Sequence, residues 1–331
     1  MEERLKWVDS SRGLAMLLVI LSHCLTIVTI TLPYLNSFIL AFHMPLFFFI
    51  SGMFAKPIKG SWGGHLYKQV KRILLPQLVL CVLRIIENLL VAVMTARSVS
   101  DIQWINWDWF LPVLFICSVT YSSLVTIHKG KIIYMKFILL LVSFAMIYPG
   151  QVLNQHEFTY IGTIINSRHI AVLPMAFFFY MMGSLYMEYK EQIKLFTNRI
   201  CSSELKGLLF IILLFVLFAL SSINGPAHMY ENKYGNIILF LITSFMGIKV
   251  GLTIAKNLSG SQFLEYVGMN SIIFYVWNFI VVHVFTSLLF RLFEGIINNE
   301  AIVLLSFVIV LFALYAIVKL SNRFFPFIYG K

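Results

Sequence analysis

Residues 7–24 read WVDSSRGLAMLLVILSHC, and this stretch decides the fold class. Its apolar part belongs to a run from residue 13 to residue 32, and a helix needs about 20 residues to cross a bilayer. Backbone groups in lipid must bond within their own segment, so a crossing run of this kind is a helix. The stretch therefore predicts a membrane helix that carries Arg12 near one surface and His23 further in.

The rest of the chain has the same character. Of its 331 residues, 60% are hydrophobic and 12% are charged, against about 25% charged residues in a soluble domain. This composition excludes a soluble globular enzyme, a disordered tail and a fibrous repeat. The sequence predicts an all-α integral membrane protein, a polytopic bundle of about ten transmembrane helices. We expect spans near residues 13–32, 36–55, 73–96, 108–127, 132–149, 169–187, 207–223, 235–254, 266–290 and 301–320.

The basic residues orient the bundle. If the amino terminus lies inside the cell, 20 of the 25 lysines and arginines fall in inside segments. The outside segments hold Arg97, Arg168, Lys233 and Arg291. The positive-inside rule then places both termini in the cytoplasm of a multi-pass protein in the plasma or inner cell membrane. Loops that face an anionic membrane surface explain the net charge of +11, so we expect no nucleic-acid partner.

The first helix carries the strongest set of polar residues. Arg12 and His23 are 11 residues apart, about three turns, so they share a helix face, and Asp9 joins that face one turn earlier. The axial separation of about 16 Å places His23 near the membrane midplane if Arg12 lies at the inner surface. Intramembrane charges and imidazoles are costly and indicate function. Two structural readings stay open: Arg12 as an interfacial anchor and His23 as a helix-to-helix hydrogen-bonding residue.

The second helix returns through AFHMPLFFFISG, residues 41–52. A short turn links it to the first helix, so the two are predicted to be antiparallel neighbours. His43 then lies about 10 Å below the outer surface, close to the depth of His23. Pro45 loosens the helix locally and frees backbone carbonyl groups. Two imidazoles at matching depth predict a polar pocket inside the bundle, although a packing role for His43 remains open.

A basic segment follows on the inside face. Residues 56–76 read KPIKGSWGGHLYKQVKRILLP, with five basic residues and no acidic one. Lys68, Lys71 and Arg72 open the third helix. The segment is either a positive-inside anchor or a phosphate clamp, since clustered lysines and arginines bind polyphosphate.

Two further places carry polar residues near or within the spans. Arg84 and Glu87 lie three residues apart within the third span, which predicts an intramembrane ion pair. Trp109 and Asp108 begin the fourth helix on the outside. They belong either to the aromatic belt or to a sugar-stacking platform with Asp108 as hydrogen-bond acceptor.

These stretches resemble acyltransferase family 3, a family of integral membrane acyltransferases. The likeness is to the branch of fucose 4-O-acetylase-like and polysaccharide O-acetyltransferases. It spans nearly the whole chain, so we expect residues 1–331 to form a single transmembrane acyltransferase domain without a fused soluble domain. The resembling stretches are VDSSRGLAMLLVILSHC, FHMPLFFFISGMF, KRILLP, DWFLPVLF, FFFYMMGSLY and LEYVGMNSIIFYVW.

The resemblance implies a membrane O-acyltransferase that uses cytoplasmic acyl-CoA, usually acetyl-CoA, as a co-substrate and no permanently bound cofactor. It implies an acceptor hydroxyl on a cell-surface or lipid-linked carbohydrate. By position, Arg12 and His23 match the family's essential pair, and Lys68 to Arg72 match its basic motif. Family members often have a histidine where this chain has Asn278. The four cysteines show no CxxC spacing, so we expect no metal site.

The expected mechanism places the CoA phosphates against Arg12, Lys68, Lys71 and Arg72, and the thioester near His23. A neutral imidazole in a dehydrated pocket is a good general base for the acceptor hydroxyl. His43 would orient the acceptor or stabilise the oxyanion. Asp9 would orient Arg12. A covalent acyl-imidazole on His23 is left open.

Two other functions remain compatible with the sequence. A transporter or flippase for a glycan or a lipid-linked intermediate would use intramembrane histidines equally well. A non-catalytic membrane subunit is the other alternative. The sequence also leaves open whether the chain forms a homo-oligomer.

Overall fold

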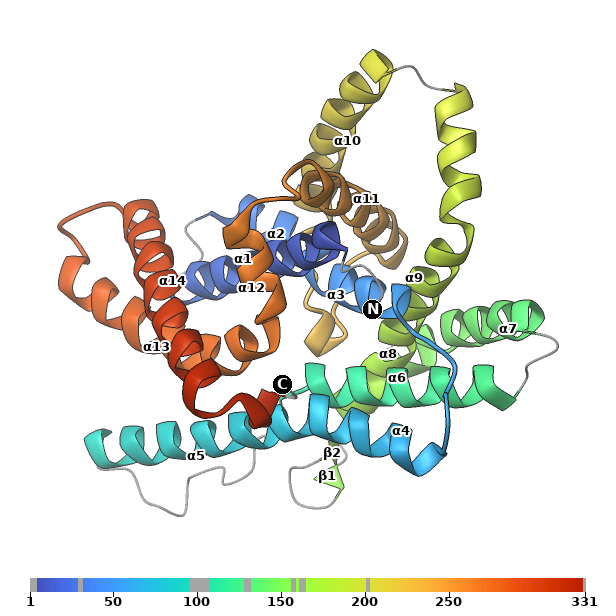
Figure 1. The fold of residues 1–331 in the computed structure, drawn as a ribbon. Helices are drawn as coiled ribbons and strands as arrows, with labels where there is room; N and C mark the ends of the chain where they lie inside the picture. The colour runs from blue at the N-terminus through green and yellow to red at the C-terminus, as the bar shows by residue number, and fades with distance from the viewer. Residues whose placement is uncertain are drawn as a thin grey trace.

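The computed structural model describes residues 5–28, 32–95, 108–127, 132–155, 159–160, 165–200 and 203–329. The regular secondary structure of these residues is helical apart from a two-stranded antiparallel ribbon of β1 (Thr159–Tyr160) and β2 (Ile165–Asn166) (Figure 1). The helices are α1 (Lys6–Ile27), α2 (Pro33–Leu40), α3 (His43–Met53), α4 (Trp62–Gln69), α5 (Leu75–Thr95), α6 (Phe110–Ile127), α7 (Ile132–Ala145), α8 (Ile147–Gln155), α9 (Ser167–Ile200), α10 (Ser203–Asn224), α11 (Ile237–Asn257), α12 (Gln262–Met269), α13 (Ser271–Phe293) and α14 (Asn299–Phe324).

Nine segments within the described ranges are long and apolar enough to cross a membrane. The all-helical, multi-pass prediction is confirmed. The expected span near 73–96 is helical as α5, although it is not among these nine. The orientation of the termini stays a prediction from charge. The nine segments are Lys6–Ile27, Pro33–Met53, Phe110–Ile127, Tyr134–Val152, Ile170–Phe196, Leu205–Asn224, Ile237–Asn257, Ser271–Phe293 and Asn299–Phe324.

The second expected span is broken, and the break positions His43. The sequence predicts one helix over 36–55, but α2 ends at Leu40 and α3 begins at His43. Pro45 has no N–H to donate to the Ala41 carbonyl, so that carbonyl needs another partner. The Ser244 hydroxyl of α11 donates to it at 2.7 Å. The loosened helix and the freed carbonyl are therefore confirmed, and the break is wider than the sequence predicts.

The expected span over 266–290 is also two helices. α12 ends at Met269 and α13 begins at Ser271. Between them, the Asn270 amide donates to the Tyr266 carbonyl at 2.7 Å and accepts from Asn322 of α14 at 2.8 Å. An asparagine side chain that bonds to nearby backbone competes with the helix ladder. The single-helix prediction was wrong here because Asn270 ends α12.

A close helix crossing holds α1, the helix that carries His23, against α12. A Cβ atom on Gly13 would collide with the Leu264 carbonyl of α12, and one on Gly268 would collide with the Asp9 carbonyl of α1. Small residues let helix backbones touch in this way. The glycine after Arg12 therefore fixes α1 directly against α12, in the turn that carries Asp9 and Arg12.

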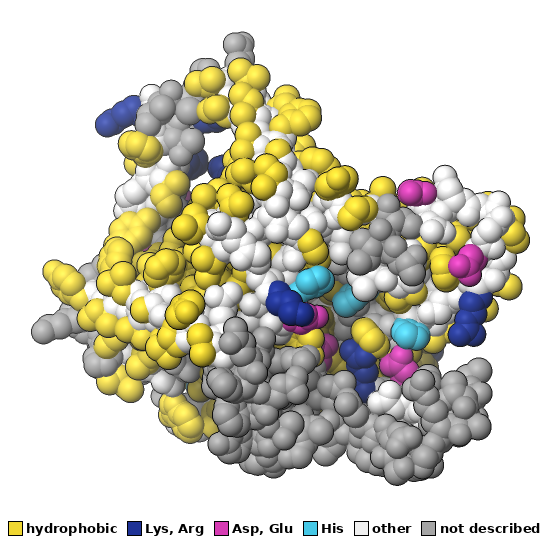
Figure 2. All heavy atoms as spheres, turned by 180° about the vertical axis from the view of Figure 1, so that it is seen from behind, with side chains coloured by type: hydrophobic (Ala, Val, Ile, Leu, Met, Phe, Trp, Pro, Cys, Tyr) yellow, Lys and Arg dark blue, Asp and Glu magenta, His cyan; other side chains and the backbone are white. Residues whose placement is uncertain are grey.

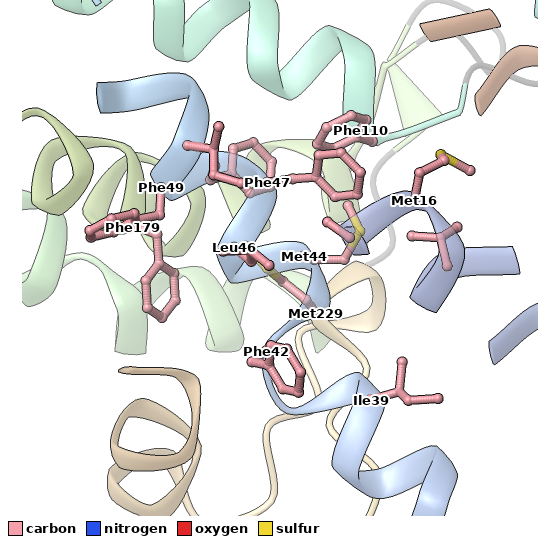
Figure 3. Packing of buried hydrophobic residues seen from close by; sticks show 14 of the residues in the cluster. Met16, Ile39, Phe42, Met44, Leu46, Phe47, Phe49, Phe110, Phe179 and Met229 are labelled. Atoms are coloured by element: carbon pink, nitrogen blue, oxygen red, sulfur yellow. The ribbon is translucent and has the colours of Figure 1, made fainter. Parts of the chain in front are cut away.

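The core lies around the α2–α3 segment, the most buried of the nine spans. Figure 3 shows its side chains Phe42, Leu46 and Phe49 among buried residues from other helices, including Phe179 of α9 and Met16 of α1. Aromatic side chains bury large apolar areas, which suits a helix surrounded by others. The segment that carries His43 is therefore a fixed part of the bundle.

The C-terminal part of α9 and the whole of α10 differ from this core. The sequence predicts a span over 169–187, but α9 continues to Ile200, and in Figure 1 it extends away from the bundle together with α10. α10 has the smallest buried share among the nine spans. In a membrane, its apolar side chains would face lipid, so these helices contribute little to the cavities described below.

Candidate active site

The first of three adjoining cavities is basic and has a volume of about 530 Å³. Its walls come mainly from α1, from the segment between α3 and α4, from α4 and from α6. No acidic side chain is among its described lining residues. Clustered lysines and arginines bind phosphate groups, so the cavity suits a polyanion. Its basic side chains are Arg12, Lys56, Lys59, Lys68 and Arg72.

Side-chain hydrogen bonds hold the basic segment against α6. The backbone N–H of Ile58 donates to the Thr126 hydroxyl at 2.7 Å, and the Trp62 indole N–H donates to the Ser123 hydroxyl at 3.1 Å. Serine and threonine on one side of α6 therefore fix the loop that carries two of the lysines.

A wide helical turn places Arg72. Residues Val70–Leu74 form a π-helical segment, η1, between α4 and α5. A π-bulge inserts an extra residue into a helix and occurs frequently at functional sites. Lys71 and Arg72 both lie in this segment, and Arg72 is the one that lines the cavity. The irregular turn thus decides which of two adjacent basic side chains faces the cavity.

Arg12 stands at the inner end of this cavity. Its guanidinium lies 3.9 Å from the buried Asp9 carboxylate and 5.8 Å from the Phe54 ring centroid. The supporting role predicted for Asp9 agrees with this geometry, since one carboxylate holds the arginine along the helix face.

A second, smaller cavity of about 260 Å³ continues inward. Arg12 and Arg72 line both cavities. Further in, its walls are mostly apolar, with Met16, Phe47 and Phe110 among them. It ends at Tyr275 of α13, which also lines the third cavity.

The third cavity has a volume of about 440 Å³ and a different chemistry. It combines imidazoles, a guanidinium, carboxylates and aromatic rings. Figure 2 shows a face of the molecule on which histidine, basic and acidic side chains gather within a largely apolar surface. The polar and aromatic residues that line the third cavity include Ser22, His23, Thr26, His43, Arg84, Asp108, Trp109, His228, Tyr230, Glu231, Tyr275, Asn278 and Phe279.

The break before α3 fixes His43. Its Nδ1 lies 2.9 Å from the Ile39 carbonyl oxygen, and the residue is buried. A carbonyl accepts, so Nδ1 carries the proton and donates, which leaves Nε2 of the neutral ring as an acceptor. A neutral His43 can therefore accept a hydrogen bond from a hydroxyl through Nε2. It cannot use that atom to donate to an oxyanion.

His23 lies on the same cavity. Its ring is half-buried and makes an edge contact with Phe279 of α13, with ring centroids 6.1 Å apart. The Ser22 hydroxyl beside it donates to Asn36 of α2 at 3.0 Å, which ties this turn of α1 to the neighbouring helix. The prediction that His23 and His43 share a polar pocket agrees with the structure.

Trp109 and Asp108 also line this cavity. The Asp108 carboxylate accepts the backbone N–H of Trp109 at 2.8 Å. The Trp109 ring lies 6.2 Å from the Tyr230 ring. The two residues predicted for the acceptor side therefore join the cavity that holds the histidines.

A comparison with known families agrees with this arrangement. The family described as an acyltransferase domain matches residues 5–319. The chain belongs to acyltransferase family 3. It is thus a multi-pass membrane acyltransferase. The branch within the family stays a prediction. No curated protein and no solved structure matches the chain.

Three further residues of this acyltransferase occupy different places. Lys71, predicted beside the CoA phosphates, is exposed and is not among the lining residues of the first two cavities. Asn278, at the position where the family often has histidine, is buried and lines the third cavity. His283, one turn beyond it, is exposed. The chain therefore places an amide at this point of the cavity.

The predicted ion pair between Arg84 and Glu87 is absent among the described residues. The Arg84 guanidinium lies 3.2 Å from the Phe279 ring centroid instead and lines the third cavity. Spacing along α5 fixes which side chains are neighbours, whereas the packing of α13 decides where the arginine points. Sequence reasoning therefore missed Arg84 as a site residue.

The segment between α10 and α11 supplies residues that sequence analysis also missed. His228 and Tyr230 line the third cavity. Tyr230 lies in the short 3-10 helix η3 (Met229–Glu231), and His228 directly precedes it. The segment is held by its own bonds, since the Asn224 amide donates to the Tyr234 carbonyl at 2.8 Å. No local pattern marks these residues, because their place in the cavity depends on tertiary packing, which for η3 includes α9.

His65 of α4 also lines the first cavity and lies outside the spans. Burial and the neighbouring Lys68 charge lower the pKa of His65 from its usual value. Across the part of the chain that the structure describes, no three His, Cys, Asp or Glu side chains group closely enough to hold a metal ion.

Proposed function

We propose that this acyltransferase moves an acyl group, most simply acetyl, from cytoplasmic acyl-CoA to a hydroxyl of a cell-surface or lipid-linked carbohydrate. One observation carries the proposal. A basic cavity and a histidine-lined cavity both adjoin a smaller one, which shares Arg12 and Arg72 with the first and Tyr275 with the other. Three cavities in this order, which we call the cavity row, suit a donor with phosphate groups at one end and a long uncharged chain that carries the thioester.

The donor would bind from the basic end. Its phosphate groups would lie against Arg12, Lys68 and Arg72, since charge-assisted hydrogen bonds from these side chains suit phosphate oxygens. The uncharged arm would follow the apolar walls of the second cavity past Met16 and Phe110. The thioester would then lie near Tyr275, within reach of the histidine cavity. Lys71 would contribute little, because it faces away.

The acceptor would enter the third cavity from the other side. His23 would take the proton of the acceptor hydroxyl as its oxygen bonds to the thioester carbonyl carbon. The carbon–sulfur bond then breaks, and the departing CoA thiolate takes the proton from His23. His43 would accept a hydrogen bond from a hydroxyl and orient it, because its Nδ1 is committed to the Ile39 carbonyl. The Trp109 ring and the Asp108 carboxylate would form the acceptor wall.

Labelled acetyl-CoA tests the proposal against the transporter alternative. The full-length protein is reconstituted in vesicles with surface glycan on the side opposite the added acetyl-CoA. We expect acetyl label to appear on the glycan. Movement of glycan across the membrane without label would favour a flippase. Absence of label on the glycan, while the protein retains acetyl-CoA binding, would overturn the transfer reaction.

A further inference from the structure

The third cavity is lined by one arginine and two carboxylates, Asp108 and Glu231. The Asp108 carboxylate accepts the backbone N–H of Trp109 at 2.8 Å. The Glu231 carboxylate lies 2.7 Å from the Lys233 ammonium group. Neither carboxylate forms an ion pair with the arginine.

The third charged side chain, Arg84, lacks an ionic partner. No carboxylate of the described residues lies within ion-pair distance of its guanidinium, Glu87 and Asp108 included. Its recorded contact is the face of the Phe279 ring. A cation among apolar side chains is costly, and an aromatic face offsets part of that cost. The guanidinium thus has no ion-pair partner among the described residues, although Asp108 and Glu231 line the same cavity.

We propose that Arg84 binds an acidic group of the acceptor, so that the acceptor is an anionic carbohydrate with a carboxylate or a phosphate. The inference rests on the proposed function and names its substrate class. A guanidinium presents paired N–H donors that match two oxygens of either group. A neutral sugar would offer the guanidinium no ion-pair partner.

The position of Arg84 separates it from the donor. The CoA phosphates have their own cations, Arg12 and Arg72, on the other side of Tyr275. Arg84 instead shares its cavity with His23 and His43. An acid group bound at Arg84 would therefore belong to the molecule whose hydroxyl meets these imidazoles.

Binding of three matched probes tests the inference without requiring catalysis. Purified full-length protein is titrated with octyl β-glucoside, its 6-phosphate and the corresponding octyl glucuronide, and the affinity is measured for each. We expect the wild type to bind an anionic probe about 10- to 100-fold more tightly than the neutral one, as for a hydrogen bond to a charged group. The tighter of the two anionic probes identifies carboxylate or phosphate as the natural group.

Substitutions assign the preference to one side chain. Arg84→Gln should lose the preference for the anionic probes, and Arg84→Lys should retain part of it. If the glutamine variant does not fold, the lysine variant carries the test, because it keeps the charge and loses the paired donors. Arg291→Gln is the matched control, since it removes an exposed arginine of α13 that lies outside the cavity. Equal affinity of the wild type for neutral and anionic probes would overturn the inference.

A transfer assay with the same probes separates this inference from the proposed function. If anionic probes bind through Arg84 but receive no acetyl label, the proposed function fails and the Arg84 assignment stands. If label reaches neutral and anionic probes equally, and Arg84→Gln lowers both rates alike, Arg84 acts at the reacting centre. That result would overturn the anionic acceptor and leave acyl transfer intact.

Discussion

The two ends of the cavity row are built in opposite ways. At the basic end, Lys68 and Arg72 are exposed side chains of one sign on a short helix and an irregular turn. At the histidine end, groups of mixed sign are individually fixed, as His43 is by the Ile39 carbonyl and Asp108 by Trp109. The first arrangement works by summed charge and the second by position. A single change should therefore cost little at one end and a great deal at the other.

The largest effect is expected at His23. Replacing it with alanine should lower the rate of acyl transfer about 100- to 10,000-fold, the usual contribution of a general base. Affinity for acetyl-CoA should stay unchanged, because the donor's charged head binds at the other end. Initial rates of label transfer and equilibrium donor binding measure the two quantities. His283→Ala, which removes an exposed imidazole of α13, should leave both intact; equal rates in the two variants would remove His23 from the mechanism.

A smaller loss of transfer rate is expected when His43 is unchanged but the hydrogen bond that stabilises the break before α3 is removed. Ser244→Ala removes the hydroxyl that donates to the Ala41 carbonyl and leaves a buried carbonyl unsatisfied, at a cost of about 1–3 kcal/mol. The break between α2 and α3 should shift, and the transfer rate should fall about tenfold with donor affinity unchanged. Ser222→Ala is the control, since that serine is exposed on α10. An unaltered rate for Ser244→Ala would mean that the break does not position the site.

The sequence could predict the place of His23 and the weakness of the helix near His43, but not the contact with Ser244. The spacing of Arg12 and His23 predicted different depths for them, and the structure has Arg12 between the first two cavities and His23 on the third, because α1 is one continuous helix with fixed geometry. Pro45 indicated a weakened helix because proline has no N–H to donate. The Ser244 hydroxyl that completes the break is more than 190 residues away in sequence, so no local pattern could reveal it.

Arg84 shows a second limit of prediction from the sequence, because here a local spacing rule gave the wrong contact. Its three-residue spacing from Glu87 is a sound reason to expect an ion pair on an isolated helix. In the bundle, Phe279 of α13 offers a ring face to the guanidinium, and the packing of one helix on another overrides the local preference. The residues around His228 were missed for the same reason, because their place in the cavity comes from tertiary contacts.

At the basic end, one substitution should have a modest effect. Arg72→Gln should weaken acetyl-CoA binding about two- to fivefold, because exposed ionic contacts contribute about 0.2–1 kcal/mol each. The transfer rate at saturating donor should not change. Lys71→Gln removes an equal charge from the adjacent residue and should leave affinity unaltered, since Lys71 does not line the cavity. Donor titrations at low and high salt measure both; equal losses in the two variants would reduce the basic segment to a membrane anchor.

The smallest effect is a pH dependence from His65. Burial and the Lys68 charge lower the pKa of His65, so its ring is mostly neutral at pH 7 without donor. Phosphate groups bound in the same cavity would favour the imidazolium and raise that pKa again. Donor binding therefore takes up a proton, and affinity should rise about twofold between about pH 7.5 and about pH 6. His65→Asn should remove the rise. A rise that persists in that variant would assign the dependence to a group other than His65, because protonation of the CoA phosphates at lower pH would weaken their binding to the basic cavity.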